Sequence, residues 1–82
     1  MNSTELARDL LRSALQLGSR ADRLTPDSAI AGALPEFNSL TVVGLIAGLE
    51  EQLGCEVSDE EITEDIFRTL GSFAQFIETK MA

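Results

Sequence analysis

One stretch of the chain, residues 39–53 (SLTVVGLIAGLEEQL), does most to limit the possible folds. It lies between Asn38, a strong helix N-cap residue, and Gly54, a natural helix stop. Apolar residues recur within it at helical spacing and would share one face: Val42, Leu45, Ile46, Leu49 and Leu53. We therefore predict a helix that begins at Asn38 or Ser39, ends before Gly54 and buries this face in a core.

The other faces of this predicted helix carry small residues, among them Thr41, Gly44 and Gly48. Each interior glycine lowers helix propensity by about 1 kcal/mol relative to alanine. Two interpretations follow. Either another part of the structure approaches closely at the glycines, or tertiary packing holds the helix in spite of them.

A first helix is predicted over residues 3–17. Asn2 and Glu5 have the spacing of a capping box, and Gly18 follows as a terminator. Its apolar face comprises Leu6, Leu10, Ala14 and Leu17. From Ser19 to Phe37 no helical period is sustained, and Pro26, Gly32 and Pro35 break the chain. We expect this long loop to be ordered because it carries regularly spaced apolar anchors: Leu24, Ile30, Leu34 and Phe37.

Two more helices are predicted after Gly54. Ser58 and Glu61 have capping-box spacing and indicate a short acidic helix, and Thr69 can cap a last helix. The apolar face of the last helix comprises Leu70, Phe73, Phe76 and Ile77. The predicted fold class is all-α: a four-helix bundle with a long ordered loop between helices one and two and a short third helix. A chain of 82 residues makes one domain, residues 1–82.

Charge and hydropathy exclude several kinds of partner. Six Lys and Arg against fourteen Asp and Glu give a net charge of −8, which repels nucleic acids and anionic lipids. The acids favour basic patches on other proteins, or they serve only solubility. No apolar run approaches the roughly 18 residues of a membrane span, so no membrane insertion is expected. The N-terminus does not resemble a secretory signal, and the single cysteine, Cys55, agrees with a reducing compartment, so we expect a cytoplasmic protein.

The residue inventory argues against catalysis. The chain has no histidine, which removes the common Ser-His and Cys-His pairs and the commonest metal ligand. Cys55 has no basic neighbour in the sequence that would activate it as a nucleophile, and we interpret it as a small packed residue. The acidic run of residues 59–65 lacks the ligand alternation and central glycine of an EF-hand. We expect no catalytic residue, no metal site and no enzymatic activity.

Ser39 occupies an informative position at the start of the predicted second helix. With Asn38 as the cap, Ser39 takes the first helical position, where its hydroxyl points outward and is not used for capping. The free N–H groups and the positive dipole end of a helix stabilise a phosphate bound beside them. Alone, however, an exposed serine at a helix start is most often an ordinary surface residue.

The run FNSLTVVGLIAGLEEQLGCEVSDEEI resembles the central segment of acyl carrier proteins, in which an Asp-Ser-Leu or Asp-Ser-Met tripeptide opens the second helix. LTPDSAI is similar to the first loop of these carriers, and residues 69–77 to their last helix. The resemblance implies an acyl-carrier-like bundle in which Ser39 carries covalent 4′-phosphopantetheine. The terminal thiol of that group would hold an acyl group as a thioester and present it to partner enzymes.

Departures from the family pattern suggest specialised partners. Asn38 stands where the family typically has aspartate, and Thr41 and Gly44 stand where carriers of fatty acid synthesis often have acids. The LPEFNSLTVV opening is more similar to the specialised carriers of bacterial exosortase systems, which implies a role in lipid or exopolysaccharide-associated biosynthesis. The partners implied are a phosphopantetheinyl transferase and an AMP-forming acyl ligase or acyltransferase. We expect the carrier to be a monomer.

If the chain is a carrier, its partners must dock near Ser39. The residues expected to contact them are an apolar strip with two acids further along the helix: Leu40, Val43, Ala47, Glu50 and Glu51. Gly44 and Gly48 would leave room for close contact with a partner. The alternative for Val43 is burial under the long first loop. Two other functions stay open: an aminoacyl carrier of the peptidyl type, and a four-helix protein-interaction module without a prosthetic group.

Overall fold

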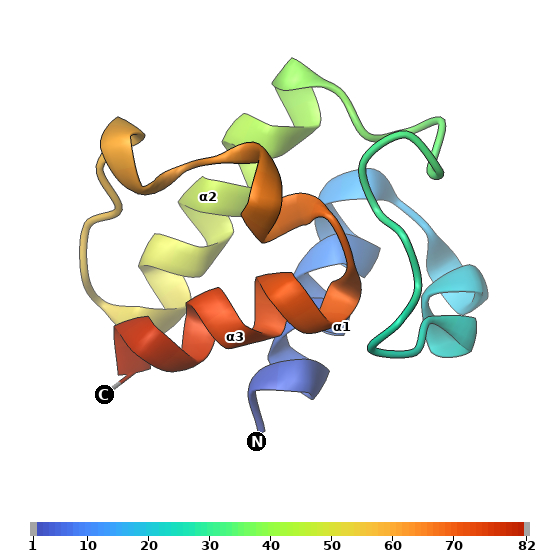
Figure 1. Ribbon diagram of the computed structural model, residues 1–82, viewed down its shortest axis with the longest axis horizontal. Helices are drawn as coiled ribbons and strands as arrows, with labels where there is room; N and C mark the ends of the chain where they lie inside the picture. The colour runs from blue at the N-terminus through green and yellow to red at the C-terminus, as the bar shows by residue number, and fades with distance from the viewer. Residues whose placement is uncertain (1, 82) are drawn as a thin grey trace.

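The computed structural model describes residues 2–81; the two ends of the predicted domain, Met1 and Ala82, lie outside the described residues. Over this range the chain is helical (Figure 1). The elements are α1 (Ser3–Leu15), η1 (Gly18–Arg23), α2 (Ser39–Leu53), η2 (Asp59–Glu61), η3 (Glu64–Phe67) and α3 (Leu70–Met81), where η denotes a 3-10 helix. The all-α prediction is confirmed, and the short third helix takes the form of the 3-10 helices η2 and η3. No helix within residues 2–81 is long and apolar enough to cross a membrane.

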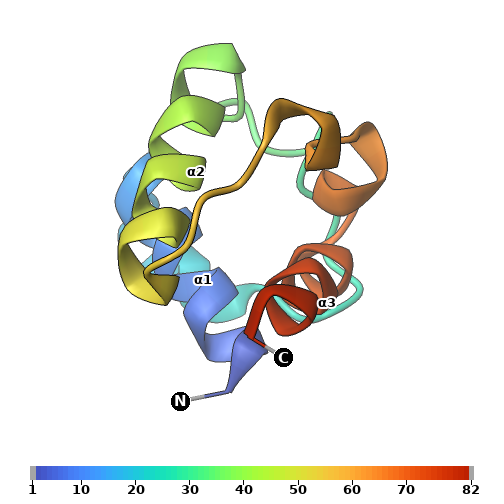
Figure 2. The same cartoon turned by 90° about the vertical axis from the view of Figure 1, so that its left-hand side faces the viewer.

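Helix α1 lies between the other two α-helices in the core. It packs against both α2 and α3, whereas α2 and α3 make few contacts with each other. Figure 2 shows α2 on one side of the molecule and η2, η3 and α3 on the other. The largest fully buried side chains are Leu11, Ile30, Leu45, Leu49, Leu70, Phe73 and Ile77.

The predicted apolar face of α2 is confirmed. Leu45, Ile46 and Leu49 are buried, and Val42 and Leu53 pack against the core from partly exposed positions. The glycines face α1: a Cβ at Gly48 would lie 3.1 Å from Leu10 Cδ2, and one at Gly44 would lie 3.9 Å from Ala14 Cβ. The close approach that Gly48 permits is therefore that of α1, whereas Gly44 is exposed and its room for a partner protein stays a prediction.

Helix α1 ends earlier than the sequence indicated. Gln16 adopts the left-handed conformation (φ 54°) and forms the C-cap, and its backbone N–H donates to Arg12 O. Leu17 is therefore not in the helix, although it is buried. Gly18, the predicted terminator, also has positive φ but begins η1 instead. A left-handed glutamine is uncommon, and nothing in the local sequence marks it.

The long first loop is ordered, as predicted, because its backbone pairs with the segment before α3. Leu70 N donates to Ser28 O at 2.9 Å, and Ala31 N donates to Phe67 O at 2.9 Å. Ile30 is fully buried between these bonds. Gly71 makes the approach possible, since a Cβ there would lie 2.8 Å from the backbone oxygen of Pro26. The loop thus closes the core at the end where α2 begins.

Candidate functional site

The start of α2 is capped by Asn38. Its Oδ1 accepts hydrogen bonds from the backbone N–H groups of Leu40 (2.9 Å) and Thr41 (3.0 Å). In return, the backbone N–H of Asn38 donates to Thr41 Oγ1 at 2.9 Å. This reciprocal arrangement is a capping box, and it satisfies the N–H groups of Leu40 and Thr41 in the first turn.

Ser39 is the first residue of α2, and it is exposed. Because Asn38 and Thr41 supply the cap, the Ser39 hydroxyl forms no hydrogen bond with any residue in the described part of the chain. The first turn of α2 contains no acidic residue to offset the positive end of the helix dipole. A phosphate attached to this hydroxyl would therefore meet a favourable field.

The turn that precedes Asn38 is held through Glu36. Its backbone oxygen accepts from Thr41 Oγ1 at 3.0 Å and from Asn38 Nδ2 at 3.3 Å. Its carboxylate pairs with Arg20 of η1, and this partner holds the pKa of the Glu36 carboxyl below its ordinary value. Glu36 therefore connects η1 to the cap beside Ser39.

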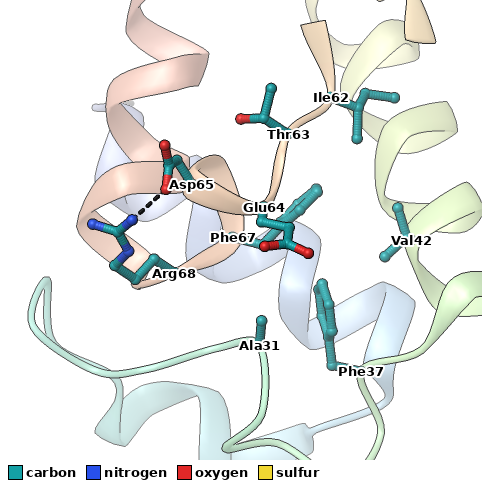
Figure 3. Close-up of a pocket in the computed structure, with 9 residues that line it drawn as sticks. All are labelled: Ala31, Phe37, Val42, Ile62, Thr63, Glu64, Asp65, Phe67 and Arg68. Carbon is teal, nitrogen blue, oxygen red and sulfur yellow. Dashed lines mark hydrogen bonds and ion pairs between the residues drawn. The ribbon is translucent and has the colours of Figure 1, made fainter. Parts of the chain in front are cut away.

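A hollow of about 570 Å³ opens between α2, the first loop and η3. Figure 3 shows its lining: apolar Ala31, Phe37, Val42, Ile62 and Phe67, with polar Thr63, Glu64, Asp65 and Arg68. The Phe37 and Phe67 rings are 5.3 Å apart, and Phe67 packs in turn on the buried Phe73. Because Phe37 and Val42 flank Ser39 closely in the sequence, the hollow lies beside the start of α2.

A second hollow of about 410 Å³ lies further along α2. It shares Val42 and Ile62 with the first, so these two side chains stand between the hollows. Its other lining residues are Val43, Ile46, Ala47, Glu50 and Val57. The two hollows together follow the side of α2 that no long helix covers.

The far wall of the first hollow was not predicted from the sequence. Ala31 comes from the first loop, Ile62 from the connection between η2 and η3, and Phe67 from η3, and no helical period links them. The one available signal was Phe67, an apolar aromatic residue within an acidic segment. An aromatic side chain among polar neighbours is expected to pack against other apolar side chains, and Phe67 packs against Phe37 and Phe73.

The structure places the predicted docking residues on two kinds of surface. Leu40 and Val43 are 81% and 66% exposed, and Ala47 and Glu51 are exposed as well. Burial of Val43 under the first loop is therefore excluded. Glu50 is half-buried, and its carboxylate accepts the backbone N–H of Val57 at 2.8 Å. Glu50 thus supports the segment after α2 in addition to carrying charge.

Comparisons with known proteins agree with this geometry. The family model described as "Phosphopantetheine attachment site" matches residues 5–77. The structure is similar to the solution NMR structure of a holo acyl carrier protein from Nitrosomonas europaea, with a TM-score of 0.89 and 42% sequence identity. The match covers 99% of this chain and 98% of that protein. No curated protein sequence matches significantly.

Proposed function

The chain belongs to the family of phosphopantetheine attachment domains, and from this premise we propose that Ser39 is the residue that carries the prosthetic group. The protein is an acyl carrier and not a catalyst: it holds an acyl group on covalently attached 4′-phosphopantetheine. The observation that supports Ser39 is its position, exposed at the start of α2 with a hydroxyl left free by the Asn38–Thr41 cap.

Attachment needs an accessible oxygen and a place for the phosphate. The serine oxygen forms a bond to the phosphorus that carries the pantetheine arm of coenzyme A. The bond between this phosphorus and the nucleotide part breaks, the nucleotide part leaves, and the transferase removes the hydroxyl proton. The product is a phosphodiester that retains one negative charge. That charge would lie at the N-terminus of α2, where the dipole favours it and where no acidic residue of the first turn repels it.

We propose that the acyl chain rests in the hollow lined by Phe37, Val42 and Phe67. These three side chains form an apolar part of the wall and the hollow opens beside Ser39, so an arm attached there can fold back and place the chain against them. Burial of apolar chain surface stabilises this state by roughly 25 cal/mol per Å². A longer chain would extend past Val42 and Ile62 into the second hollow.

The partners are a phosphopantetheinyl transferase and acyl-handling enzymes, and the loading enzyme we propose is an AMP-forming acyl ligase or an acyltransferase. These partners would contact exposed residues near the attachment point: Leu40, Val43, Ala47 and Glu51. Glu50 adds negative charge beside them. We also propose that residues 1–82 act as one cytoplasmic, monomeric domain, in a pathway of the exosortase-associated type.

An aminoacyl group is the second candidate cargo. Figure 3 shows the Glu64 carboxylate among the side chains that line the hollow. Glu64 forms no ion pair with any residue of the described range. A carboxylate there suits a cargo that carries an amine better than it suits a plain hydrocarbon chain.

Mass spectrometry of the protein from its native source tests both proposals. Cleavage after glutamate releases residues 37–50, whose only serine is Ser39. We expect phosphopantetheine on this fragment, and the mass of the group on its thiol identifies an acyl or an aminoacyl cargo. Phosphopantetheine on another fragment would overturn the assignment of Ser39 and leave the carrier function intact.

A further inference from the structure

We propose that Arg20, acting through Glu36, is a positioning residue for the turn that presents Ser39 to the transferase. This inference rests on Ser39 being the attachment site. Arg20 lies in η1, and the pair it forms with Glu36 joins segments 16 residues apart. The pair therefore ties the turn before α2 to a separate part of the fold.

The connection runs through one residue. The Glu36 side chain is bound to Arg20, and the Glu36 backbone oxygen is bound to both members of the cap, Thr41 and Asn38. Thr41 and Asn38 in turn bracket Ser39. A change in the position of Glu36 is therefore transmitted directly to the backbone that carries the Ser39 hydroxyl.

The start of α2 has few other anchors. Asn38, Ser39 and Leu40 are all exposed, and the first buried residue of α2 is Leu45. Figure 1 shows this first turn projecting at the top of the molecule, beyond the part of α2 that packs on α1. Phe37, which packs on Phe67, is another attachment of the turn, and Leu34 and Val42 pack against the core on either side of it. The ion pair is therefore one of a small number of contacts that hold the turn carrying Ser39.

The environment of Glu36 makes Arg20 more important than an average surface arginine. The Glu36 side chain is 32% exposed, and its Oε1 is buried without a hydrogen-bond partner in the described part of the chain. Loss of Arg20 would leave this half-buried carboxylate without its compensating charge. Exposed pairs generally change equilibrium constants by a few fold, so we expect an effect of about two- to fivefold.

Arg23 provides a matched control. It lies in the same 3-10 helix, it is exposed, and within residues 2–81 it forms no ion pair. Arg20→Gln and Arg23→Gln remove the same charge from the same element. Only the first removes the contact to Glu36.

The first measurement is amide hydrogen exchange by NMR on the apo protein, which needs no transferase. We expect exchange at Leu40 and Thr41, whose N–H groups bond to Asn38, to accelerate about two- to fivefold in Arg20→Gln and in Glu36→Gln. Exchange in the α1–α3 core should not change. Arg23→Gln should match the wild type at all these positions.

The second measurement is the rate of phosphopantetheine transfer from coenzyme A by a broad-specificity transferase. We expect Arg20→Gln and Glu36→Gln each to slow transfer about two- to fivefold. The variant with both substitutions should be no slower than either single variant, and the charge-swapped variant, Arg20→Glu with Glu36→Arg, should recover the wild-type transfer rate. Equal exchange and equal transfer rates in Arg20→Gln and Arg23→Gln would overturn the proposal. If the wild type itself accepts no group, the attachment proposal fails, and the exchange result still decides whether Arg20 holds the turn.

Discussion

The side chains of Asn38 and Thr41 close the start of α2 by exchanging hydrogen bonds. The Thr41 backbone N–H donates to Asn38 Oδ1 at 3.0 Å, and the Asn38 backbone N–H donates to Thr41 Oγ1 at 2.9 Å. Ser39 lies between these two residues and takes no part in the exchange. The helix start is therefore complete without the serine hydroxyl, which stays available for chemistry.

This cap predicts different outcomes for two substitutions at Asn38. Asn38→Ala removes the acceptor for two N–H groups and should lower the free energy of unfolding by about 1 kcal/mol, or the melting temperature by roughly 4–8 °C. Asn38→Asp keeps the acceptor and places there the residue that the family typically carries, so we expect it to accelerate phosphopantetheine transfer. Thermal melts and transfer rates check the two effects. A transfer rate that is unchanged or lower in Asn38→Asp would mean that asparagine is harmless or adapted to its own transferase.

Val43 tests the docking surface. It is 66% exposed, so Val43→Glu should leave the fold intact while placing a charge in the apolar contact area beside Ser39. We expect an AMP-forming ligase to load the holo variant at least about tenfold more slowly, as for a residue central to an interface. Met81→Glu is the control, because it charges another exposed apolar side chain at the end of α3. Wild-type loading of a normally folded Val43→Glu would show that partners dock elsewhere.

The two glycines of α2 should respond differently to alanine. At Gly44 the new Cβ would make an ordinary contact of 3.9 Å with Ala14, so the gain in helix propensity should raise stability by about 0.5–1 kcal/mol. At Gly48 the Cβ would lie only 3.1 Å from Leu10 Cδ2, and α1 would have to adjust. Chemical denaturation should therefore rank Gly44→Ala above the wild type and above Gly48→Ala. The opposite ranking would mean that α1 crosses α2 differently.

The ion pair between Glu61 of η2 and Lys80 of α3 predicts a dependence of stability on pH. Lys80, with help from the backbone of Ser58, holds the pKa of Glu61 below its ordinary value of 4.5. Because the pKa is lower in the folded state, ionised Glu61 stabilises the fold above about pH 4.5, and this contribution is lost as the pH falls through the folded-state pKa. Glu61→Gln should therefore be less stable than the wild type at pH 7, and the difference should become smaller as the pH falls below 4.5. A difference in melting temperature that stays constant as the pH is lowered from 7 into the acid range would contradict this role.

The helices and their caps could be predicted from the sequence because they depend on local patterns. The period of Leu45, Ile46 and Leu49 gives the buried face of α2, and the Thr69 cap appears as expected in a reciprocal pair with Ser72. The position of Ser39 follows from the same local reasoning. The proposed use of Ser39 as an attachment site came from the resemblance to a family, since an exposed serine at a helix start does not by itself indicate a function.

Other features depend on contacts between distant segments and could not be predicted. The left-handed Gln16 that ends α1 and the hollow between Val42 and Phe67 have no local signature. The Arg20–Glu36 ion pair joins two charged residues between α1 and α2. Many other ion pairs between the charged residues of the chain were equally compatible with the sequence. Glu50 was predicted as a docking residue, yet its carboxylate also holds Val57. In each case the tertiary arrangement decided the outcome.

The intact mass of the apo protein after incubation with coenzyme A and a broad-specificity phosphopantetheinyl transferase tests the central claim most directly. Wild type, Ser39→Ala and Ser58→Ala should be compared, since Ser58 is another exposed serine and its backbone bonds to Glu61 do not depend on Ser39. We predict the addition of one phosphopantetheine to the wild type and to Ser58→Ala, and none to Ser39→Ala. Addition of the group to a folded Ser39→Ala variant would contradict the assignment of Ser39 as the attachment site.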